Sequence, residues 1–383
     1  MKKLGLKMTF GALAACAAMV THAQTDVIKV GVNQPLTGVV AAAGNFVTAG
    51  AKIAADEINE KGGVLGKKLV LVIEDNKSNP TEAANATEKL IVRDKVPVLM
   101  GAWSSTYTLA AMPKLMEYKV PMVVETSSSS KITSQGNPYV FRISPTSAME
   151  AVTFSRHIKP LNIRKADFLV VNNDWGLGSA TAYGDVLKQH GATVGKVQTM
   201  DAAAQDMSSQ LSSIKGSDAD TLVLTTGPEQ TVLVLKQAQA LGLNKQIITT
   251  GGNMPEQLIA QAGSAADGTM HVMMFVPWFP EATADPAAAK HFIEEWNKRK
   301  LDPAGMPEGS RGYDGINTIA AAIEKAGSAE PAKILDALWK TEINGLTGKV
   351  AFHKEGPKGR ESAQSTPTTY LVKIEDGKVA YIP

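Results

Sequence analysis

The sequence contains a single cysteine, Cys16, and it lies in an N-terminal segment that we expect to be removed. Residues 1–23 have the pattern of a secretory signal peptide: a lysine-rich start precedes an apolar stretch, residues 8–20, that is too short to span a bilayer. The small residues Thr21 and Ala23 predict cleavage after Ala23, which places the mature protein in the periplasm. Without Cys16 the mature chain has no disulfide, cysteine nucleophile or thiolate metal ligand. Two alternatives stay open: an uncleaved anchor, and a lipoprotein signal at residues 13–16 that tethers the chain through Cys16.

The sequence also lacks a large excess of charge of one sign. It has 39 basic and 37 acidic side chains, and three of the basic ones, Lys2, Lys3 and Lys7, lie in the leader. The mature chain is therefore close to neutral, and neither nucleic acid nor an anionic membrane surface is an expected partner. No later apolar run approaches the roughly 18 residues of a membrane helix, so we expect no span in the mature chain.

Catalytic motifs are missing as well. There is no nucleophile elbow and no phosphate-binding lysine loop, and Gly176 and Gly178 lack the third glycine of a dinucleotide fingerprint. Ser128 and Lys131 match the S-x-x-K pattern, but the motifs that accompany it are absent. No histidine has a second metal ligand three or four residues away; those of the mature chain are His157, His190, His271, His291 and His353. The sequence predicts no enzyme, no metal site and no cofactor.

Short apolar segments alternate with amphipathic helical segments along most of the chain. Strands are predicted at residues 28–32, 68–73, 96–100, 121–124, 168–171, 222–224 and 247–249. The rhythm begins again after residue 143, and the tail, residues 349–382, changes to short strands around turns. This alternation predicts an α/β protein with two doubly wound parallel-sheet lobes. Because no low-complexity linker separates the halves, we expect a cleft between closely packed lobes.

Hydroxyl-rich loops follow the third and fourth predicted strands, at residues 101–106 and 125–130. In a doubly wound sheet, loops at the carboxyl ends of neighbouring strands line the ligand crevice. A carboxylate would find three favourable features there: the hydroxyl donors, the free N–H groups of the helix that follows, and the positive end of that helix's dipole. The alternative is that both segments are ordinary polar loops and helix caps.

Aromatic residues make up only 5% of the sequence, which makes the position of each tryptophan informative. Trp103 lies on the first hydroxyl-rich loop, and Trp175 follows a strand of the second half. A tryptophan in a loop after a strand is a candidate wall of a ligand pocket. Trp296, on a helix face, is expected to pack in the core.

Several short segments, each weak alone, are specific in their order and spacing. They are residues 28–32, 36–38, 54–59, 62–63, 172–176 and 237–242. This set resembles the leucine/isoleucine/valine-binding family of periplasmic solute-binding proteins, which have the type I fold and serve ABC transporters. The resemblance covers nearly the whole mature chain.

The resemblance implies two lobes that are joined by three crossovers and close on a ligand by a hinge motion. Lobe 1 is then residues 26–144 and 273–348, and lobe 2 is residues 145–272 and 349–383. Carried over by position, the ligand site comprises Trp103, Ser104, Ser105, Thr126, Ser127, Ser128, Trp175 and Asn253. Within it, Ser105 and Ser128 are expected to hold the carboxylate, with the backbone of Thr126. The two tryptophans are expected to line the pocket.

One departure from the family concerns the ligand's ammonium group. The amino acid binders of the family hold it with an acidic residue after a second-lobe strand, where this chain has residues 249–253, ending in Asn253, without an acid. Burying an unpaired ammonium costs several kcal/mol, which argues against an ordinary α-amino acid. Glu229, on a neighbouring loop, is the candidate replacement. Aromatic acids and amides, which the family also includes, fit the tryptophans and hydroxyls.

The expected function is capture of a small carboxylated solute for an ABC permease in the inner membrane, by a protein that acts as a monomer. A ligand sensor of the same fold is the first alternative. An exported hydrolase is the second, and it lacks a nucleophile and base in this sequence.

Overall fold

The central strands are apolar on both faces, and Val30, Val32, Val123 and Val223 are fully buried. Strands of this kind are typical of parallel sheets covered by helices on each side. The computed structural model describes residues 27–383 and places the strands in two seven-stranded sheets and one small hairpin. The predicted leader, its cleavage at Ala23 and the alternative lipid anchor at Cys16 lie outside the described residues.

The two sheets share one strand order. The first contains, from edge to edge, β13 (His353–Glu355), β14 (Ser362–Gln364), β5 (Val140–Arg142), β4 (Met122–Val124), β3 (Leu99–Gly101), β1 (Val27–Gln34) and β2 (Lys68–Asp75). The second contains β16 (Lys378–Ile382), β15 (Tyr370–Glu375), β10 (Met270–Met273), β9 (Gln246–Thr249), β8 (Thr221–Thr225), β6 (Lys165–Val171) and β7 (Thr193–Met200). The order β2-β1-β3-β4-β5 is repeated as β7-β6-β8-β9-β10, all in parallel, and antiparallel pairs occur only at the opposite edge. The predicted fold of two doubly wound lobes is confirmed.

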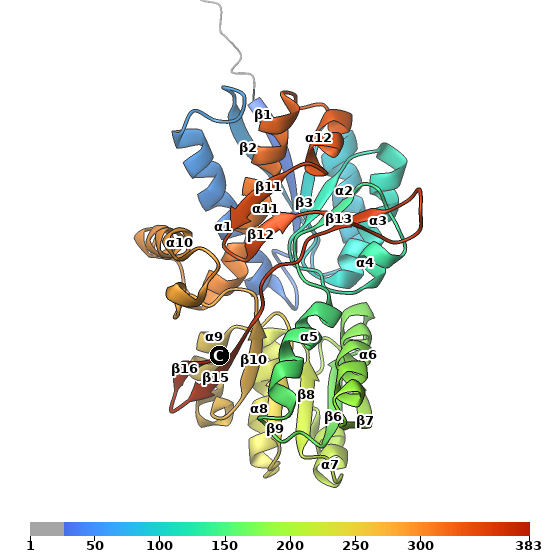
Figure 1. Ribbon diagram of the computed structural model, residues 1–383, viewed down its shortest axis with the longest axis vertical. Helices are drawn as coiled ribbons and strands as arrows, with labels where there is room; N and C mark the ends of the chain where they lie inside the picture. The colour runs from blue at the N-terminus through green and yellow to red at the C-terminus, as the bar shows by residue number, and fades with distance from the viewer. Residues whose placement is uncertain (1–26) are drawn as a thin grey trace, which may run out of the picture.

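Helices flank both sheets, and Figure 1 shows the resulting lobes one above the other. The first lobe carries α1 (Ala41–Glu60), α2 (Pro80–Val92), α3 (Ser105–Tyr118), α4 (Lys131–Ser134), α10 (Pro286–Lys298), α11 (Met306–Ala326), α12 (Pro331–Leu338) and the hairpin β11 (Glu342–Gly345) and β12 (Gly348–Ala351). The second carries α5 (Ser147–Ile158), α6 (Asp174–Gln189), α7 (Ser208–Lys215), α8 (Pro228–Ala240) and α9 (Pro255–Ala262). Three short 3₁₀ helices complete the set: η1 (Gly263–Ala266), η2 (Pro280–Ala282) and η3 (Pro303–Gly305). None of the helices within residues 27–383 combines the length and apolar character needed to cross a bilayer.

The helices α1 and α11 approach each other at glycines. A Cβ atom added at Gly50 of α1 would lie 1.8 Å from the carbonyl oxygen of Gly309, and one added at Gly312 of α11 would lie 1.9 Å from the carbonyl oxygen of Val47. The two backbones are therefore in direct contact. Trp296 packs beside them with no exposed surface, as predicted.

The chain passes between the sheets three times: after β5, after β10 and after β14. The predicted boundary of the last crossing was wrong. Residues 349–364 were assigned to lobe 2, but β13 pairs with β14, and β14 pairs in parallel with β5 of the first sheet through Ala363 and Gln364. This tail segment completes lobe 1, and only the antiparallel strands β15 and β16 join the second sheet.

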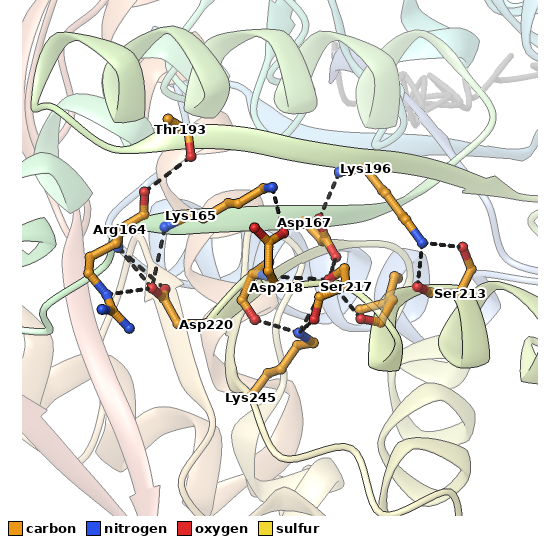
Figure 2. A network of polar contacts seen from close by, with 12 residues as sticks. Arg164, Lys165, Asp167, Thr193, Lys196, Ser213, Ser217, Asp218, Asp220 and Lys245 are labelled. Carbon is orange, nitrogen blue, oxygen red and sulfur yellow. Dashed lines mark hydrogen bonds and ion pairs between the residues drawn. The ribbon is translucent and has the colours of Figure 1, made fainter.

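A polar network holds the amino ends of β6, β7 and β8 together, at the end of the second sheet opposite the carboxyl ends of its parallel strands (Figure 2). The buried carboxylate of Asp167 accepts hydrogen bonds from the Lys196 backbone N–H, at 2.7 Å, and from the Ser217 hydroxyl. A Cβ atom at Gly195 would lie 2.1 Å from Asp167 Oδ1, so this carboxylate fits only against a glycine. We interpret the network as structural, since each carboxylate and ammonium drawn in it has a partner.

Candidate functional site

The carboxyl ends of strands from both lobes meet around a cavity that, with its opening to solvent included, measures about 330 Å³. The first lobe contributes the loops after β3 and β4 and part of α11, and the second contributes the start of α5 and the segments after β6 and β9. The lining residues are Trp103, Ser104, Ser105, Thr126, Ser127, Ser128, Glu150, Trp175, Gly251, Gly252 and Arg311. A concave site between two lobes, lined by aromatic rings and a few polar groups, is a typical position for a small ligand.

Hydroxyl and N–H donors are gathered at the start of α3 on the first lobe. Ser104 begins α3 without capping it through its side chain, and the first backbone bond of the helix is from Thr108 N to Ser104 O, at 3.0 Å. The Ser105 oxygen accepts a hydrogen bond from the backbone N–H of Ser129, at 3.0 Å, which leaves the Ser105 proton to be donated. Free N–H groups at a helix start and an available hydroxyl form an anion-binding arrangement.

The loop after β4 supplies the other hydroxyls. Ser128 Oγ lies 3.1 Å from Ser147 Oγ. One of the two hydroxyl protons is used in this hydrogen bond, and the other can be donated to a ligand. The hydroxyl of Ser127 donates to the carbonyl oxygen of Trp103 at 2.8 Å, so its proton is already engaged within the protein. Thr126 lines the cavity beside them.

The rings of Trp103 and Trp175 both lie close to one glycine turn. A Cβ atom at Gly252 would lie 3.8 Å from the ring of Trp103 and 3.7 Å from that of Trp175. Gly251 and Gly252 have φ values of 56° and 57°, a conformation that favours glycine. Trp103 itself has a φ of 59°, and strained backbone of this kind is frequent at ligand sites. Glycine at these two positions leaves room beside the rings that a larger side chain would fill.

A buried ion pair lies behind Trp103. The Trp103 indole N–H donates to Glu308 Oε2 at 2.8 Å, and Arg311 Nη2 lies 3.2 Å from Glu308 Oε1. Both side chains of the pair are almost fully buried. The charge of Arg311, which also lines the cavity, is therefore matched by Glu308.

Glu150, in the first turn of α5, is a buried acid on the cavity wall without an ion-pair partner among the described residues. Its Oε2 atom is inaccessible and has no hydrogen-bond partner. Burial raises the pKa of Glu150 to about 7, against the opposing effect of Arg311 and Arg142. Glu150 therefore lines the cavity as an acid whose charge no ion pair within residues 27–383 balances.

Arg142 of β5 positions the loop that carries the serines. Its guanidinium donates to the carbonyl oxygens of Ser127, at 3.2 Å, and Ser129, at 2.6 Å, and to the side chains of Thr133 and Gln364. Burial lowers the pKa of Arg142 to about 9, so the group still carries its charge at neutral pH. A fully buried cation thereby fixes the backbone that presents Ser128.

The structure brings seven of the eight predicted site residues to one cavity. Asn253 is the exception: it is buried, and its amide donates to the carbonyl oxygen of Val272 at 3.1 Å, away from the wall. Glu229 also lies off the wall, and burial and then the charge of Glu308 raise its pKa. Glu150 and Arg311 were not predicted, because single charged residues on helices carry no local signal of a site. That the seven residues bind a ligand stays a prediction.

The lobes also touch at the edge of the cleft. Lys131 Nζ of α4 lies 2.8 Å from Asp174 Oδ1 of α6, across the boundary between the lobes. Within residues 27–383, no group of three or more His, Cys, Asp or Glu side chains is placed to hold a metal ion.

Comparison with known proteins identifies the family. The family model described as periplasmic binding protein matches residues 27–378. A Leu/Ile/Val-binding protein of Rhizobium johnstonii is 30% identical over 98% of both chains, and a leucine-, isoleucine-, valine-, threonine- and alanine-binding protein of Pseudomonas aeruginosa is 27% identical over 92% of both.

Solved structures of similar fold support the same family assignment. A leucine-binding protein of Thermotoga maritima superposes with a TM-score of 0.82 at 28% identity, over 93% of this chain and 98% of that one. A solute-binding protein of Rhodopseudomonas palustris in complex with 3,4-dihydroxybenzoic acid superposes with a TM-score of 0.79 at 25% identity, over 93% and 96%. The chain therefore belongs to the periplasmic binding proteins, and among them to the branched-chain amino acid family with the type I fold.

Proposed function

We propose that this chain is the periplasmic solute-binding component of an ABC importer and captures a small carboxylated solute between its lobes. The observation that carries this proposal is the interlobe cavity, whose wall combines the start of α3, including Ser105, with Trp103 and Trp175. The family consists of solute-binding proteins, and capture followed by docking on a permease requires no chemistry on the ligand. The protein acts as a monomer in this proposal.

The arrangement explains how closure and binding are coupled. Ser105, Ser128 and the first N–H groups of α3 belong to lobe 1, whereas Trp175 and Gly251 belong to lobe 2. A ligand whose carboxylate rests on the serines also contacts the second lobe only when the cleft is closed. Ligand binding therefore favours the closed form by the difference in its contacts between the two states. The closed form is what we expect the permease to recognise.

The relatives support a carboxylate without deciding its class. Those compared above bear names that specify branched-chain and other amino acids, and one contains an aromatic acid. A carboxylate group is common to all these ligands. The expected measurement is a rise in melting temperature of the purified mature protein with at least one carboxylate from a panel of amino acids, aromatic acids and dicarboxylates, with amides included for comparison. If no compound stabilises the protein, or only uncharged amides do, the proposal is wrong.

Replacing Ser105 or Ser128 with alanine is expected to weaken binding of that carboxylate by about 1–3 kcal/mol each, the usual effect of removing a partner of a charged group. Isothermal titration calorimetry measures this directly. Ser130→Ala is the matched control, because Ser130 lies on the same loop but is exposed and does not line the cavity. Unchanged affinity in both test variants would rule out this anion site.

A further inference from the structure

The two tryptophans of the cavity wall are held differently. The indole N–H of Trp103 donates to Glu308 Oε2 at 2.8 Å, and the Glu308 side chain has no exposed surface. The carbonyl oxygen of Trp103 accepts a second hydrogen bond, from the Ser127 hydroxyl at 2.8 Å. The indole N–H of Trp175 has no acceptor within residues 27–383. Hydrogen bonds therefore fix the ring of Trp103 on lobe 1 but not that of Trp175 on lobe 2.

The acceptor lies on a rigid part of lobe 1. Glu308 directly precedes Gly309 on α11, and the carbonyl oxygen of Gly309 would lie 1.8 Å from a Cβ atom at Gly50 of α1. One helical turn after Glu308, a Cβ atom at Gly312 would lie 1.9 Å from the carbonyl oxygen of Val47. Because the two helix backbones touch at these points, helix packing sets the position of the Glu308 carboxylate, and the ligand does not.

Glu308 acts from behind the wall. Trp103 lines the cavity and Glu308 does not, while the second oxygen of Glu308, Oε1, lies 3.2 Å from Arg311 Nη2. A charged acceptor holds its donor more firmly than a neutral one. If the Trp103 ring turned away, a buried carboxylate oxygen would lose its partner, which is unfavourable. The ring of Trp103 is therefore a wall that exists before any ligand binds.

We infer that Glu308 is a positioning residue that determines ligand selectivity: by fixing the Trp103 ring it fixes the width of the cavity on the lobe 1 side, and Trp175 is the wall that adjusts. This inference rests on the proposed function, because selectivity requires a ligand. A fixed wall distinguishes ligands by size, since an added methylene must fit the space or displace the ring. Without the hydrogen bond the ring can turn, and ligands of different size are then bound more evenly.

The test compares two replacements that both remove the charge of Glu308. Glu308→Gln keeps an oxygen acceptor for the indole N–H and Glu308→Met does not, so any effect of leaving Arg311 without its ion pair is common to both variants. Titration calorimetry on the purified mature protein uses carboxylates that differ by one methylene: valine with leucine, benzoate with phenylacetate, and any other ligand found in the panel with its next homologue.

The native protein is expected to distinguish the members of at least one pair by about ten-fold or more, the usual effect of one methylene in a fitted pocket. Glu308→Met should reduce this ratio of dissociation constants by at least about five-fold, and Glu308→Gln should keep it within about two-fold. A residue that only stabilised the fold would lower the melting temperature and leave the ratio unchanged.

Glu256→Met is the matched control. Trp278 Nε1 donates to Glu256 Oε1 at 2.8 Å, and neither residue lines the cavity. This variant should leave the ratio unchanged. Proton–nitrogen correlation NMR reports each indole N–H separately, and Trp103→Phe identifies the signal of Trp103. Glu308→Met should shift that signal and speed its exchange with solvent, whereas Glu256→Met should affect only the signal of Trp278.

The inference is overturned, and the proposed function stands, if ligands bind but the native protein distinguishes no pair, or if Glu308→Met preserves the ratio. It is also overturned if Glu308→Gln and Glu308→Met lower the ratio alike, because the charge and not the acceptor would then matter. If no carboxylate binds at all, the proposed function itself has failed. If Glu308→Met does not fold, exchange in the native protein without ligand decides: the indole N–H of Trp103 must exchange at least about ten-fold more slowly than that of Trp175, and equal rates overturn the inference.

Discussion

Replacing Arg142 with methionine is expected to lower the free energy of unfolding by about 3–5 kcal/mol, the range seen when one side of a buried charged contact is removed. The guanidinium makes hydrogen bonds to two carbonyl oxygens and two side chains, all buried. Methionine fills much of the volume but satisfies none of these acceptors, and buried acceptors without partners are costly. Urea denaturation followed by circular dichroism measures the effect.

Arg142→Met should also loosen the loop that presents Ser128, so the variant, where it remains folded, should bind the carboxylate ligand more weakly. Arg156→Met is the control, because Arg156 is exposed on α5 and its loss should change stability by no more than about 0.5 kcal/mol. A loss below about 1 kcal/mol for Arg142→Met would show that the loop is fixed by other contacts.

Gly50→Ala is expected to destabilise the first lobe by about 3 kcal/mol, the upper end of the usual overpacking cost. The added methyl group would lie 1.8 Å from the carbonyl oxygen of Gly309, which is backbone and cannot swing away. Helices α1 and α11 would have to separate along their contact. Alanine has a better intrinsic helix propensity than glycine by about 1 kcal/mol, and this gain offsets part of the steric cost.

Gly178→Ala provides the opposite case. Gly178 lies within α6, and the nearest atom to an added Cβ is Ser129 Oγ at 3.9 Å, an ordinary contact distance. The same substitution there should raise the free energy of unfolding by up to about 1 kcal/mol. The melting temperature and the free energy of unfolding, measured by thermal and urea denaturation, should therefore fall for Gly50→Ala and rise for Gly178→Ala. A Gly50→Ala variant as stable as the native protein would show that the helix contact is looser than described.

The predicted positions of the loops agree with the structure where topology alone decides position. Parallel strands end at a common edge, so hydroxyl-rich loops after β3 and β4 had to lie together. The same rule placed Trp175 at the corresponding edge of the second lobe. Asn253 follows β9, as the rule requires, but its side chain hydrogen-bonds to Val272 and does not line the cavity. The sequence does not indicate which rotamer this side chain adopts.

The failures concern contacts between residues far apart in the chain. The edge strand β7 was not predicted, because only its last residue, Met200, is buried, and polar residues such as Lys196 and Gln198 interrupt the apolar pattern seen in the inner strands. The short polar strands β13 and β14 carry no signal for the sheet that they join. Arg142 and Glu150 were not singled out, because no local pattern marks either residue. Their importance comes from burial, which is set by the surrounding tertiary structure.

The three passages of the chain between the lobes also constrain when each lobe can finish folding. Arg142 and Gln364 are neighbours in the first sheet but lie 222 positions apart in the sequence. The first lobe therefore cannot be completed until nearly the whole chain has been made, because ring closure over such a distance must wait for its last strand. We therefore expect the folding of lobe 1 to end with the addition of β14 beside β5.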